Sequence, residues 1–254
     1  MIKQRIMRQL IIILVTGALV SITCSTYAQT IAVNRFHKVI ISPYIQATFV
    51  QGDEERVTIN STNVDSNKLH IEVHGGTLRV YLDGAKDIPH NESAYGEDGK
   101  QHSYHRYPDH SVIVTVTYKK LNELSLRGSE TYLCQSPLST NSFNLRVYGD
   151  SKVIFTEVHF SQMYTTIYGD GSLDIRSGEV NSQHYTCYGD GKIDATAIAG
   201  QAAKVTAFGE AQVKVNVSQR IKITSFGEAR IGYLGNPEIV KGIHFGGVNL
   251  QKID

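Results

Sequence analysis

Apolar and polar residues alternate along the stretch from Leu145 to Ile231. A period of two is typical of β-strands that bury one face, not of helices. A two-residue motif, an aromatic residue followed by glycine and called a phrase below, recurs five times within this stretch at steps of 20, 20, 20 and 18 residues. A fixed period of about 20 residues is typical of stacked repeats. The glycines of the five phrases are Gly149, Gly169, Gly189, Gly209 and Gly227.

Positions at even distances from these glycines are mostly apolar or small, and those at odd distances are mostly polar or charged. The even positions are therefore expected to face a core, since side chains alternate between the two faces of a strand. Four residues after the glycines, for example, stand Val153, Leu173, Ile193, Val213 and Ile231.

A coil of about 20 residues, rising about 3.3 Å each, accommodates two or three short strands and their turns. Equivalent positions of neighbouring coils would stack about 4.8 Å apart. The pattern predicts an all-β fold, a right-handed parallel β-helix, because the hexapeptide period of left-handed β-helices is missing. Glycine fits a corner that requires a positive φ or leaves no room for a side chain.

Residues 30–82 carry shorter β-like segments in place of the repeat. Turn residues such as Ser42-Pro43 and Gly75-Gly76 separate them. They are expected to be irregular first coils or a β cap that closes the end of the solenoid, and we favour the irregular cap. The five predicted segments are 36–41, 45–51, 56–60, 69–74 and 77–82.

Residues 83–110 form a polar, histidine-rich insertion, after which a strand resumes at 111–118. Loops of this length are usually functional or disordered. We interpret the insertion as a solvated surface loop. The alternative is a metal site made from His102, His105, Asp109 and His110. No fixed ligand spacing supports it, so we expect no metal and no cofactor.

Residues 1–28 have the features of an export signal peptide. Basic residues precede an apolar run at 10–20, and Thr26-Tyr27-Ala28 is a small-residue cleavage site. The run is too short to span a bilayer comfortably. We expect cleavage after Ala28, which leaves one domain, residues 29–254, without a transmembrane segment. The alternative is a lipoprotein acylated at Cys24, although Ser21-Ile22-Thr23 is a poor lipobox.

Removing residues 1–28 takes away three of the 25 basic residues and none of the 24 acidic ones, which leaves a charge of about −2. Nothing indicates nucleic-acid binding, which would call for a basic patch. Cys134 and Cys187 remain, in coils three apart, about 14 Å along the axis. Because a disulfide needs Cα atoms within about 7 Å, we expect no bridge between them.

The order of several short motifs resembles one protein family. The motifs are Phe36-x-x-Val39, 49–53 (FVQGD), 76–80 (GTLRV) and 118–128 (YKKLNELSLRG), followed by the YGDG-type turns. The chain is similar over about 33–248 to the head GIN domain family of putative auto-transporter adhesins, exported proteins of Bacteroidetes. The resemblance implies a pectate-lyase-like β-helix and an adhesive role, without catalytic residues. The family repeat often reads GSGD, whereas here an aromatic residue precedes each glycine.

The aromatic residues of the five phrases are the first candidate site for ligand binding. By parity they face outward, where a column of rings would stack on sugar rings or pack on a partner. The alternative is that the glycine corner reverses the parity and the rings stack inside the coil or under the N-terminal segment. The five residues are Tyr148, Tyr168, Tyr188, Phe208 and Phe226.

A column of acids is the second candidate, since like charges at this spacing repel unless something compensates them. A cation such as Ca²⁺ would do so, but aspartates that cap the turns explain the column more simply. The five acids are Asp150, Asp170, Asp190, Glu210 and Glu228.

The alternative function is a polysaccharide-active lyase or hydrolase, which requires paired carboxylates at a defined separation. Here the repeat itself explains the spacing of the carboxylates, and no nucleophile elbow or phosphate loop is present. We therefore predict a non-enzymatic adhesin or recognition module of the cell envelope. It would be periplasmic, on the outer-membrane surface or secreted. Its expected partners are a surface glycan, a protein ligand or a second copy of the chain.

Overall fold

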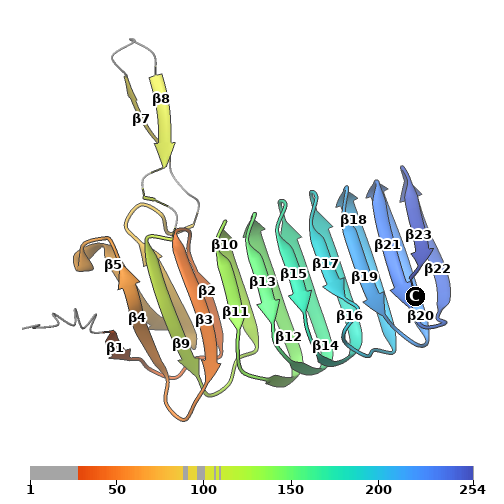
Figure 1. The fold of residues 1–254 in the computed structure, drawn as a ribbon, viewed down its shortest axis with the longest axis horizontal. Helices are drawn as coiled ribbons and strands as arrows, with labels where there is room; N and C mark the ends of the chain where they lie inside the picture. Colours follow the sequence, from red (N-terminus) through yellow and green to blue (C-terminus); the bar gives the residue numbers. More distant parts are fainter. Residues whose placement is uncertain (1–27, 88–90, 96–100, 106, 109, 254) are drawn as a thin grey trace, which may run out of the picture.

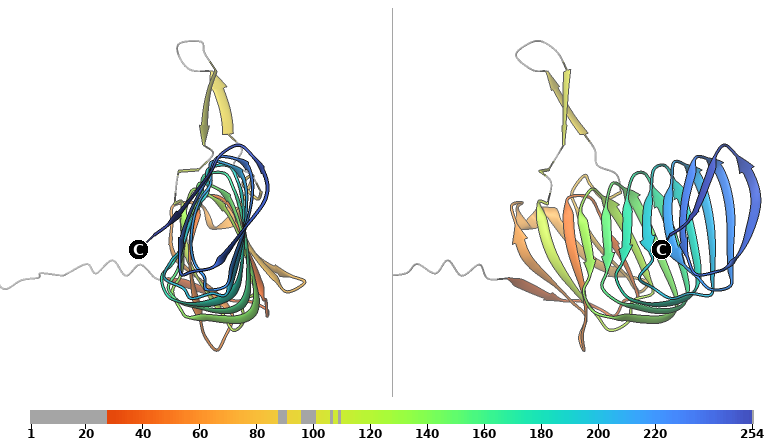
Figure 2. Two further views of the ribbon diagram at one scale, coloured as in Figure 1. Left: turned by 90° about the vertical axis from the view of Figure 1, so that its right-hand side faces the viewer. Right: turned by 45° about the vertical axis from the view of Figure 1, so that its right-hand side comes forward.

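The computed structural model describes residues 28–87, 91–95, 101–105, 107–108 and 110–253. Within these residues, two long sheets wind into a solenoid whose axis runs horizontally in Figure 1. Viewed along the axis in Figure 2, the coils are flattened ovals with one sheet on each long side. The expected signal peptide lies outside the described residues except for Ala28.

We call the two sheets sheet I and sheet II. Sheet I consists, in spatial order, of β1 (Gln29–Ala32), β4 (Arg56–Thr62), β9 (Val112–Tyr118), β3 (Ile45–Gln51), β11 (Thr131–Cys134), β13 (Lys152–Phe155), β15 (Ser172–Ile175), β17 (Lys192–Ala195), β19 (Gln212–Asn216), β21 (Ala229–Leu234) and β23 (Val248–Lys252). Sheet II consists of β5 (Leu69–His74), β6 (Thr77–Leu82), β2 (Lys38–Ile41), β10 (Glu123–Gly128), β12 (Leu138–Gly149), β14 (Val158–Tyr168), β16 (Gly178–Tyr188), β18 (Ala202–Gly209), β20 (Arg220–Gly227) and β22 (Glu238–Phe245).

From β10 onward, each coil contributes one strand to sheet II and the next to sheet I, and all neighbouring strands are parallel. The register follows the repeat, so Tyr148 lies beside Tyr168 and Tyr168 beside Tyr188. The predicted all-β parallel β-helix with coils of about 20 residues is confirmed. The even positions are buried, as expected, and form one continuous core along the solenoid.

The glycine of each phrase stands at the turn from sheet II to sheet I. Gly209 has φ +130°, and a Cβ there would lie 2.6 Å from the carbonyl oxygen of Gly189 in the preceding coil. Both expected reasons for glycine therefore apply: the backbone conformation disfavours other residues, and the stacked turns leave no space. This close stacking keeps successive turns in line along one edge of the solenoid.

Cys134 and Cys187 are both buried and free. Burial raises the pKa of the Cys134 thiol far above its ordinary value and that of Cys187 to about 12. Both residues therefore act as small apolar groups in the core.

The five segments predicted in the N-terminal region all form strands, but their stacking order departs from the chain order. β6 and β9 make a coil that lies outside the coil of β2 and β3, on the side away from the repeats (Figure 1). Beyond it, β4 pairs with β9, β5 with β6 and β1 with β4, all antiparallel. The expected irregular coils and the expected cap are thus both present. A short 3₁₀ helix, η1 (Ser66–Lys68), joins β4 to β5.

The insertion between β6 and β9 carries the hairpin of β7 (Asn91–Tyr95) and β8 (Gln101–His105). It leaves the solenoid at the edge where the glycine turns lie, and it projects upward in Figure 1. The hypothetical metal ligands His102, His105 and Asp109 lie outside the residues whose side chains are described. The described part of the chain has no helix with the length and apolar character needed to cross a bilayer.

Candidate functional site

The predicted aromatic residues form one continuous stack on the outside of sheet II. Ring centroids are 4.8–5.0 Å apart from Tyr148 to Phe226, with interplanar angles of 2–7°. Phe245 of β22 extends the stack at 5.7 Å and 21°. We call these six rings the aromatic ladder: Tyr148, Tyr168, Tyr188, Phe208, Phe226 and Phe245.

The aromatic ladder faces solvent. Its rings from Tyr168 to Phe226 are 36–41% exposed, and Phe245 is 67% exposed. The alternative expectation, that the glycine corner reverses the parity and buries the rings, is wrong. Each strand keeps its alternation up to the residue before the glycine, so the turn begins only after the ring is placed outside.

The stacking also decides which part of each ring a ligand meets. A ring with a parallel neighbour on both sides has both faces covered, so its exposed area is its edge and, for tyrosine, its hydroxyl group. The outer face of Phe245, the last ring, is the exception. The expected stacking of sugars on the ring faces is therefore not available along the interior of the aromatic ladder.

A cation covers the N-terminal end of the aromatic ladder. The guanidinium carbon of Arg127 lies 5.4 Å from the ring centroid of Tyr148. Asp87, at the base of the insertion, forms ion pairs with Arg127 and with Arg79. Burial raises the pKa of Asp87, but hydrogen bonds from Arg127 and Arg79 lower it more. The net pKa is below the ordinary aspartate value, so this carboxyl stays charged at a lower pH than a free aspartate would.

Two further rows run along sheet II beside the aromatic ladder. Half-buried threonines lie two residues before the rings, paired from coil to coil: Thr166, Thr186, Thr206 and Thr224. We call them the threonine row. Four residues before the rings lie Tyr164, His184, Lys204 and Lys222, which we call the outer row. The threonine row is thus a strip of small side chains between two rows of large ones.

The sequence pattern pointed to five rings of the aromatic ladder, but not to the threonine row or the outer row. Alternation places all of these residues outside, and it does not distinguish a row with a common chemistry from ordinary surface. Phe245 was also missed, although Phe245-Gly246 repeats the aromatic–glycine pair 19 residues after Gly227.

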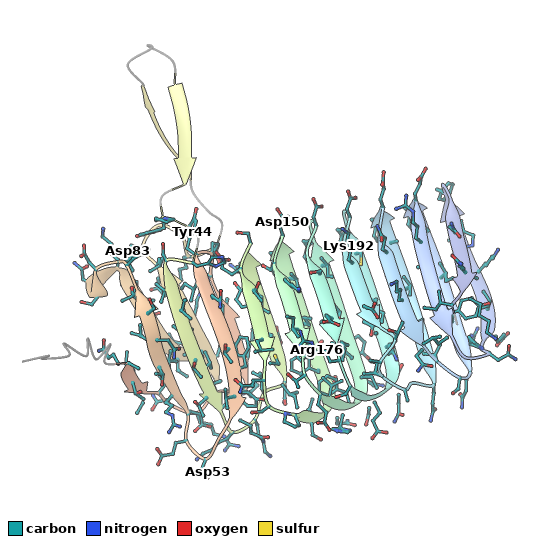
Figure 3. All side chains as sticks on the ribbon, in the orientation of Figure 1. Tyr44, Asp53, Asp83, Asp150, Arg176 and Lys192 are labelled. Atoms are coloured by element: carbon teal, nitrogen blue, oxygen red, sulfur yellow. The ribbon has the colours of Figure 1, made fainter. Side chains whose placement is uncertain are left out.

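The predicted acid column lies along the turn edge, one residue beyond the glycines, where Figure 3 places Asp150. All five side chains are exposed. None of their carboxylates takes part in a hydrogen bond or ion pair with the described residues, so the expected capping of the turns is not observed. The described residues likewise contain no cluster of three or more potential metal ligands.

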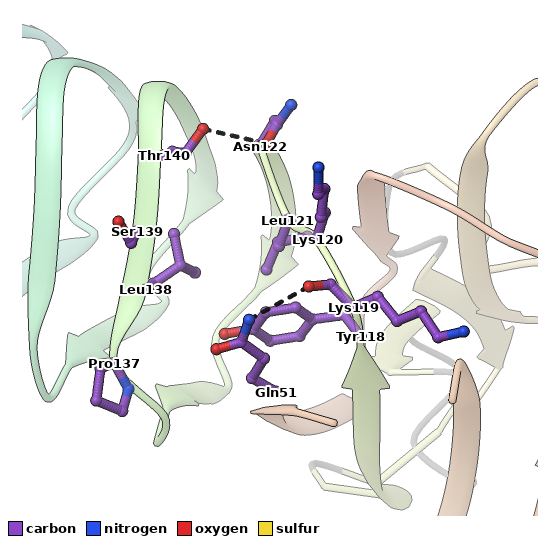
Figure 4. Close-up of a pocket in the computed structure, with 10 residues that line it drawn as sticks. All are labelled: Gln51, Tyr118, Lys119, Lys120, Leu121, Asn122, Pro137, Leu138, Ser139 and Thr140. Carbon is purple, nitrogen blue, oxygen red and sulfur yellow. Dashed lines mark hydrogen bonds between the residues drawn. The ribbon is translucent and has the colours of Figure 1, made fainter. Parts of the chain in front are cut away.

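A pocket of about 350 Å³ opens at the opposite edge of the solenoid (Figure 4). It lies where residues 119–122 connect β9 to β10 and bypass the intervening coil of β2 and β3. Its described lining is Gln51, Tyr118, Lys119, Lys120, Leu121, Asn122, Pro137, Leu138, Ser139 and Thr140.

The lining of this pocket combines two lysines, Lys119 and Lys120, with uncharged residues. The amide of Gln51 donates to the carbonyl oxygen of Lys119 at 3.3 Å, and the ammonium of Lys119 lies 3.8 Å from the carboxylate of Glu55. Figure 4 shows the ammonium groups of Lys119 and Lys120 pointing away from Tyr118. The lining contains no carboxylate and no imidazole among the described residues. Acid–base pairs of the kind that glycosidases use are therefore not gathered there.

A family model described as "Putative auto-transporter adhesin, head GIN domain" matches residues 35–237. No curated protein is significantly similar to the chain. A crystal structure described as a putative adhesin from Bacteroides fragilis is similar, with a TM-score of 0.72 and 17% identity over 89% of this chain and 96% of that chain. A structure described as a putative lipid binding protein from Parabacteroides distasonis gives a TM-score of 0.64 and 19% identity over 89% and 96% of the chains. At these identities the likeness concerns the fold.

Proposed function

Because the chain belongs to the head GIN domain family of putative auto-transporter adhesins, we propose that it is an exported recognition module. It binds a glycan or protein ligand through the outer face of sheet II. The aromatic ladder, the threonine row and the outer row form the binding face. Residues 1–28 direct its export to the periplasm, the outer-membrane surface or the medium.

The main observation behind this proposal is the line of six aromatic rings on the outside of sheet II, each directly before a turn glycine with positive φ. A contiguous exposed apolar strip is uncommon on a soluble protein unless something binds to it. Tyrosines are favoured at recognition surfaces because they combine a large rigid contact area with a hydroxyl group. The regular spacing suits a ligand that is itself extended, such as a polysaccharide or a peptide strand.

The polysaccharide-active enzyme has less support. Its chemistry needs two carboxylates on either side of a scissile bond, or a cationic base beside a bound metal. The exposed acids form a line along one edge, and the pocket at the other edge has two lysines but no carboxylate among its described lining residues. The described residues also contain no cluster of three or more potential metal ligands beside those lysines. That the protein is not an enzyme, and that it associates with itself, both remain predictions.

The test is a glycan-array and surface-protein binding assay on residues 29–254, with a Tyr168→Ser/Tyr188→Ser variant. A matched control, Lys152→Gln/Lys192→Gln, changes exposed side chains of sheet I instead. Circular dichroism verifies that each variant is folded. We expect saturable binding that the ladder variant loses and the control retains. Binding that both variants retain, or the absence of binding to either class of ligand, would refute the proposal.

A further inference from the structure

The binding face is not uniform along the solenoid. Towards the N-terminus, the outer row begins with Tyr164, beside a tyrosine of the aromatic ladder. Towards the C-terminus it continues with exposed Lys204 and Lys222, which lie across the threonine row from Phe208 and Phe226. On β22 the neighbour of Lys222 is Val240, whereas Lys241 pairs with the buried Ile223, so the lysines of the outer row end at Lys222. Cationic side chains therefore gather in the C-terminal half of the face.

These cations are unneutralised. No carboxylate of the described residues lies within ion-pairing distance of Lys204 or Lys222. On the same sheet Arg220 does have a partner, since its Nε is 4.0 Å from a carboxylate oxygen of Glu238. The field of the lysines reaches the next coil. Burial lowers the pKa of His184, and the positive charge of Lys204 lowers it further.

The aromatic rings beside these lysines also favour negative charge. An aromatic ring is electronegative over its faces and electropositive around its edge. Because the neighbouring rings cover the faces of Phe208 and Phe226, a ligand meets their edges. Lysines on one side of the threonine row and ring edges on the other thus present positive potential to the same strip. The hydroxyl groups of Thr206 and Thr224 lie between them as hydrogen-bond donors.

The acid column limits where such a ligand lies. Glu210 and Glu228 are exposed on the far side of the ring row from the lysines. An anionic chain is repelled from that edge and attracted to the strip beside Lys204 and Lys222. The charges therefore favour one path for an anionic ligand across the binding face, along the threonine row and parallel to the solenoid axis.

We infer that the C-terminal half of the binding face holds a linear polysaccharide carrying carboxylate groups, which face Lys204 and Lys222 while the sugar chain runs along the threonine row. This inference rests on the proposed function and specifies its ligand. A linear ligand is required because the cations and hydroxyls repeat from coil to coil. A carbohydrate is favoured over a purely ionic polymer because threonine hydroxyls and ring edges separate the two charged columns.

The experiment measures binding of residues 29–254 to alginate, a linear polyuronate, with dextran as the neutral comparison. The test variant is Lys204→Gln/Lys222→Gln, and the control is Lys152→Gln/Lys192→Gln, which removes the same charge from sheet I. We expect alginate to bind and dextran to bind much more weakly. The test variant should weaken alginate binding about ten-fold at low salt, and the control by less than about two-fold, since salt screens exposed charges.

Two further probes separate carbohydrate from other polyanions: single-stranded DNA and vesicles that contain anionic phosphatidylglycerol. Binding of either as tight as that of alginate would overturn the inference, as would equal effects of the two lysine variants. If alginate does not bind but another ligand does so in a ladder-dependent way, the inference fails and the proposed function stands. If no ligand depends on the aromatic ladder, both fail.

Discussion

Arg127 covers the outer face of Tyr148, with its guanidinium carbon 5.4 Å from the ring centroid. The same guanidinium group forms an ion pair with Asp87 at the base of the insertion. One side chain thus closes the N-terminal end of the aromatic ladder and joins it to the segment that carries the hairpin. An ion pair therefore links the aromatic ladder directly to the base of the insertion, although 40 residues separate Arg127 from Asp87 in the chain.

Replacing Arg127 by Gln should destabilise the fold by about 1–2 kcal/mol, because it removes a cation–π contact and leaves Asp87 with Arg79 alone. Denaturant unfolding gives the free energy. The control is Arg176→Gln, at the residue labelled in Figure 3. It breaks the exposed pair between Arg176 and Asp174, 3.4 Å apart, and should cost less than about 0.5 kcal/mol. Equal losses in the two variants would show that the contact with Tyr148 contributes nothing.

Because interior rings of the aromatic ladder stack on two neighbours, removing one should destabilise the fold more than removing the last ring. Tyr188→Ala removes contacts with Tyr168 and Phe208, whereas Phe245→Ala removes only the contact with Phe226. Each aromatic pair contributes about 0.5–1.5 kcal/mol. We therefore expect Tyr188→Ala to lower the free energy of unfolding by about 1–3 kcal/mol, and Phe245→Ala by about half of that. Thermal and denaturant unfolding of the two variants provide the comparison. A larger loss at Phe245 would contradict the expectation.

The turn glycines should tolerate no side chain. Gly209→Ala forces a Cβ to within 2.6 Å of a backbone oxygen and keeps φ at +130°, so we expect a loss of about 3 kcal/mol or more. Gly75 is the matched control, because it also has a positive φ, +56°, but a methyl group on its Cα would have no other atom within 4 Å. Gly75→Ala should cost only about 1–2 kcal/mol. Similar stability of the two variants would mean that neighbouring coils are not packed as closely as the turns indicate.

Two histidines of sheet II should have pKa values on opposite sides of the ordinary histidine pKa: that of His159 above it and that of His184 below it. A hydrogen bond to Glu157 raises the pKa of His159, and burial, followed by the charge of Lys204, lowers that of His184. His184 also stacks on Tyr164 at 4.6 Å and lies 3.1 Å from the hydroxyl oxygen of Ser182. Proton NMR titration resolves both rings. A pKa for His184 at or above that of His159 would contradict the expectation.

The shifted pKa values of His159 and His184 make the free energy of unfolding depend on pH, in opposite directions. The folded pKa of His159 is raised, so its contribution is complete below the unfolded value of about 6.5 and is lost as the pH rises through the folded pKa. The folded pKa of His184 is lowered, so its contribution is complete above about 6.5 and is lost as the pH falls through the folded pKa. His184→Gln should therefore flatten the decline in stability below that pH. Urea unfolding between about pH 5 and pH 8 measures it.

The repeat alone was sufficient to predict the solenoid, its buried positions and its turn glycines. Alternation with period two decides which side chains of a strand share a face, and a fixed period places Val153 and Leu173 in one column. Because these properties depend only on residues that are close in the chain, they can be predicted from the sequence. The side on which the aromatic residues lie remained open, because a glycine corner permits either parity. The tertiary structure resolves it by extending each strand as far as the ring, at Tyr168 for example.

Other features depend on contacts that alternation does not encode. Any stacking order of the N-terminal coils would bury the same alternating residues, so the position of β2 and β3 between β9 and the repeats arises only in three dimensions. The connection 119–122 that this order requires opens the pocket beside Tyr118. The meeting of Arg127, Asp87 and Tyr148 is likewise a product of folding. Sequence determined the repeating unit because each strand carries its own pattern, and the tertiary structure decided how the unique segments pack against that unit.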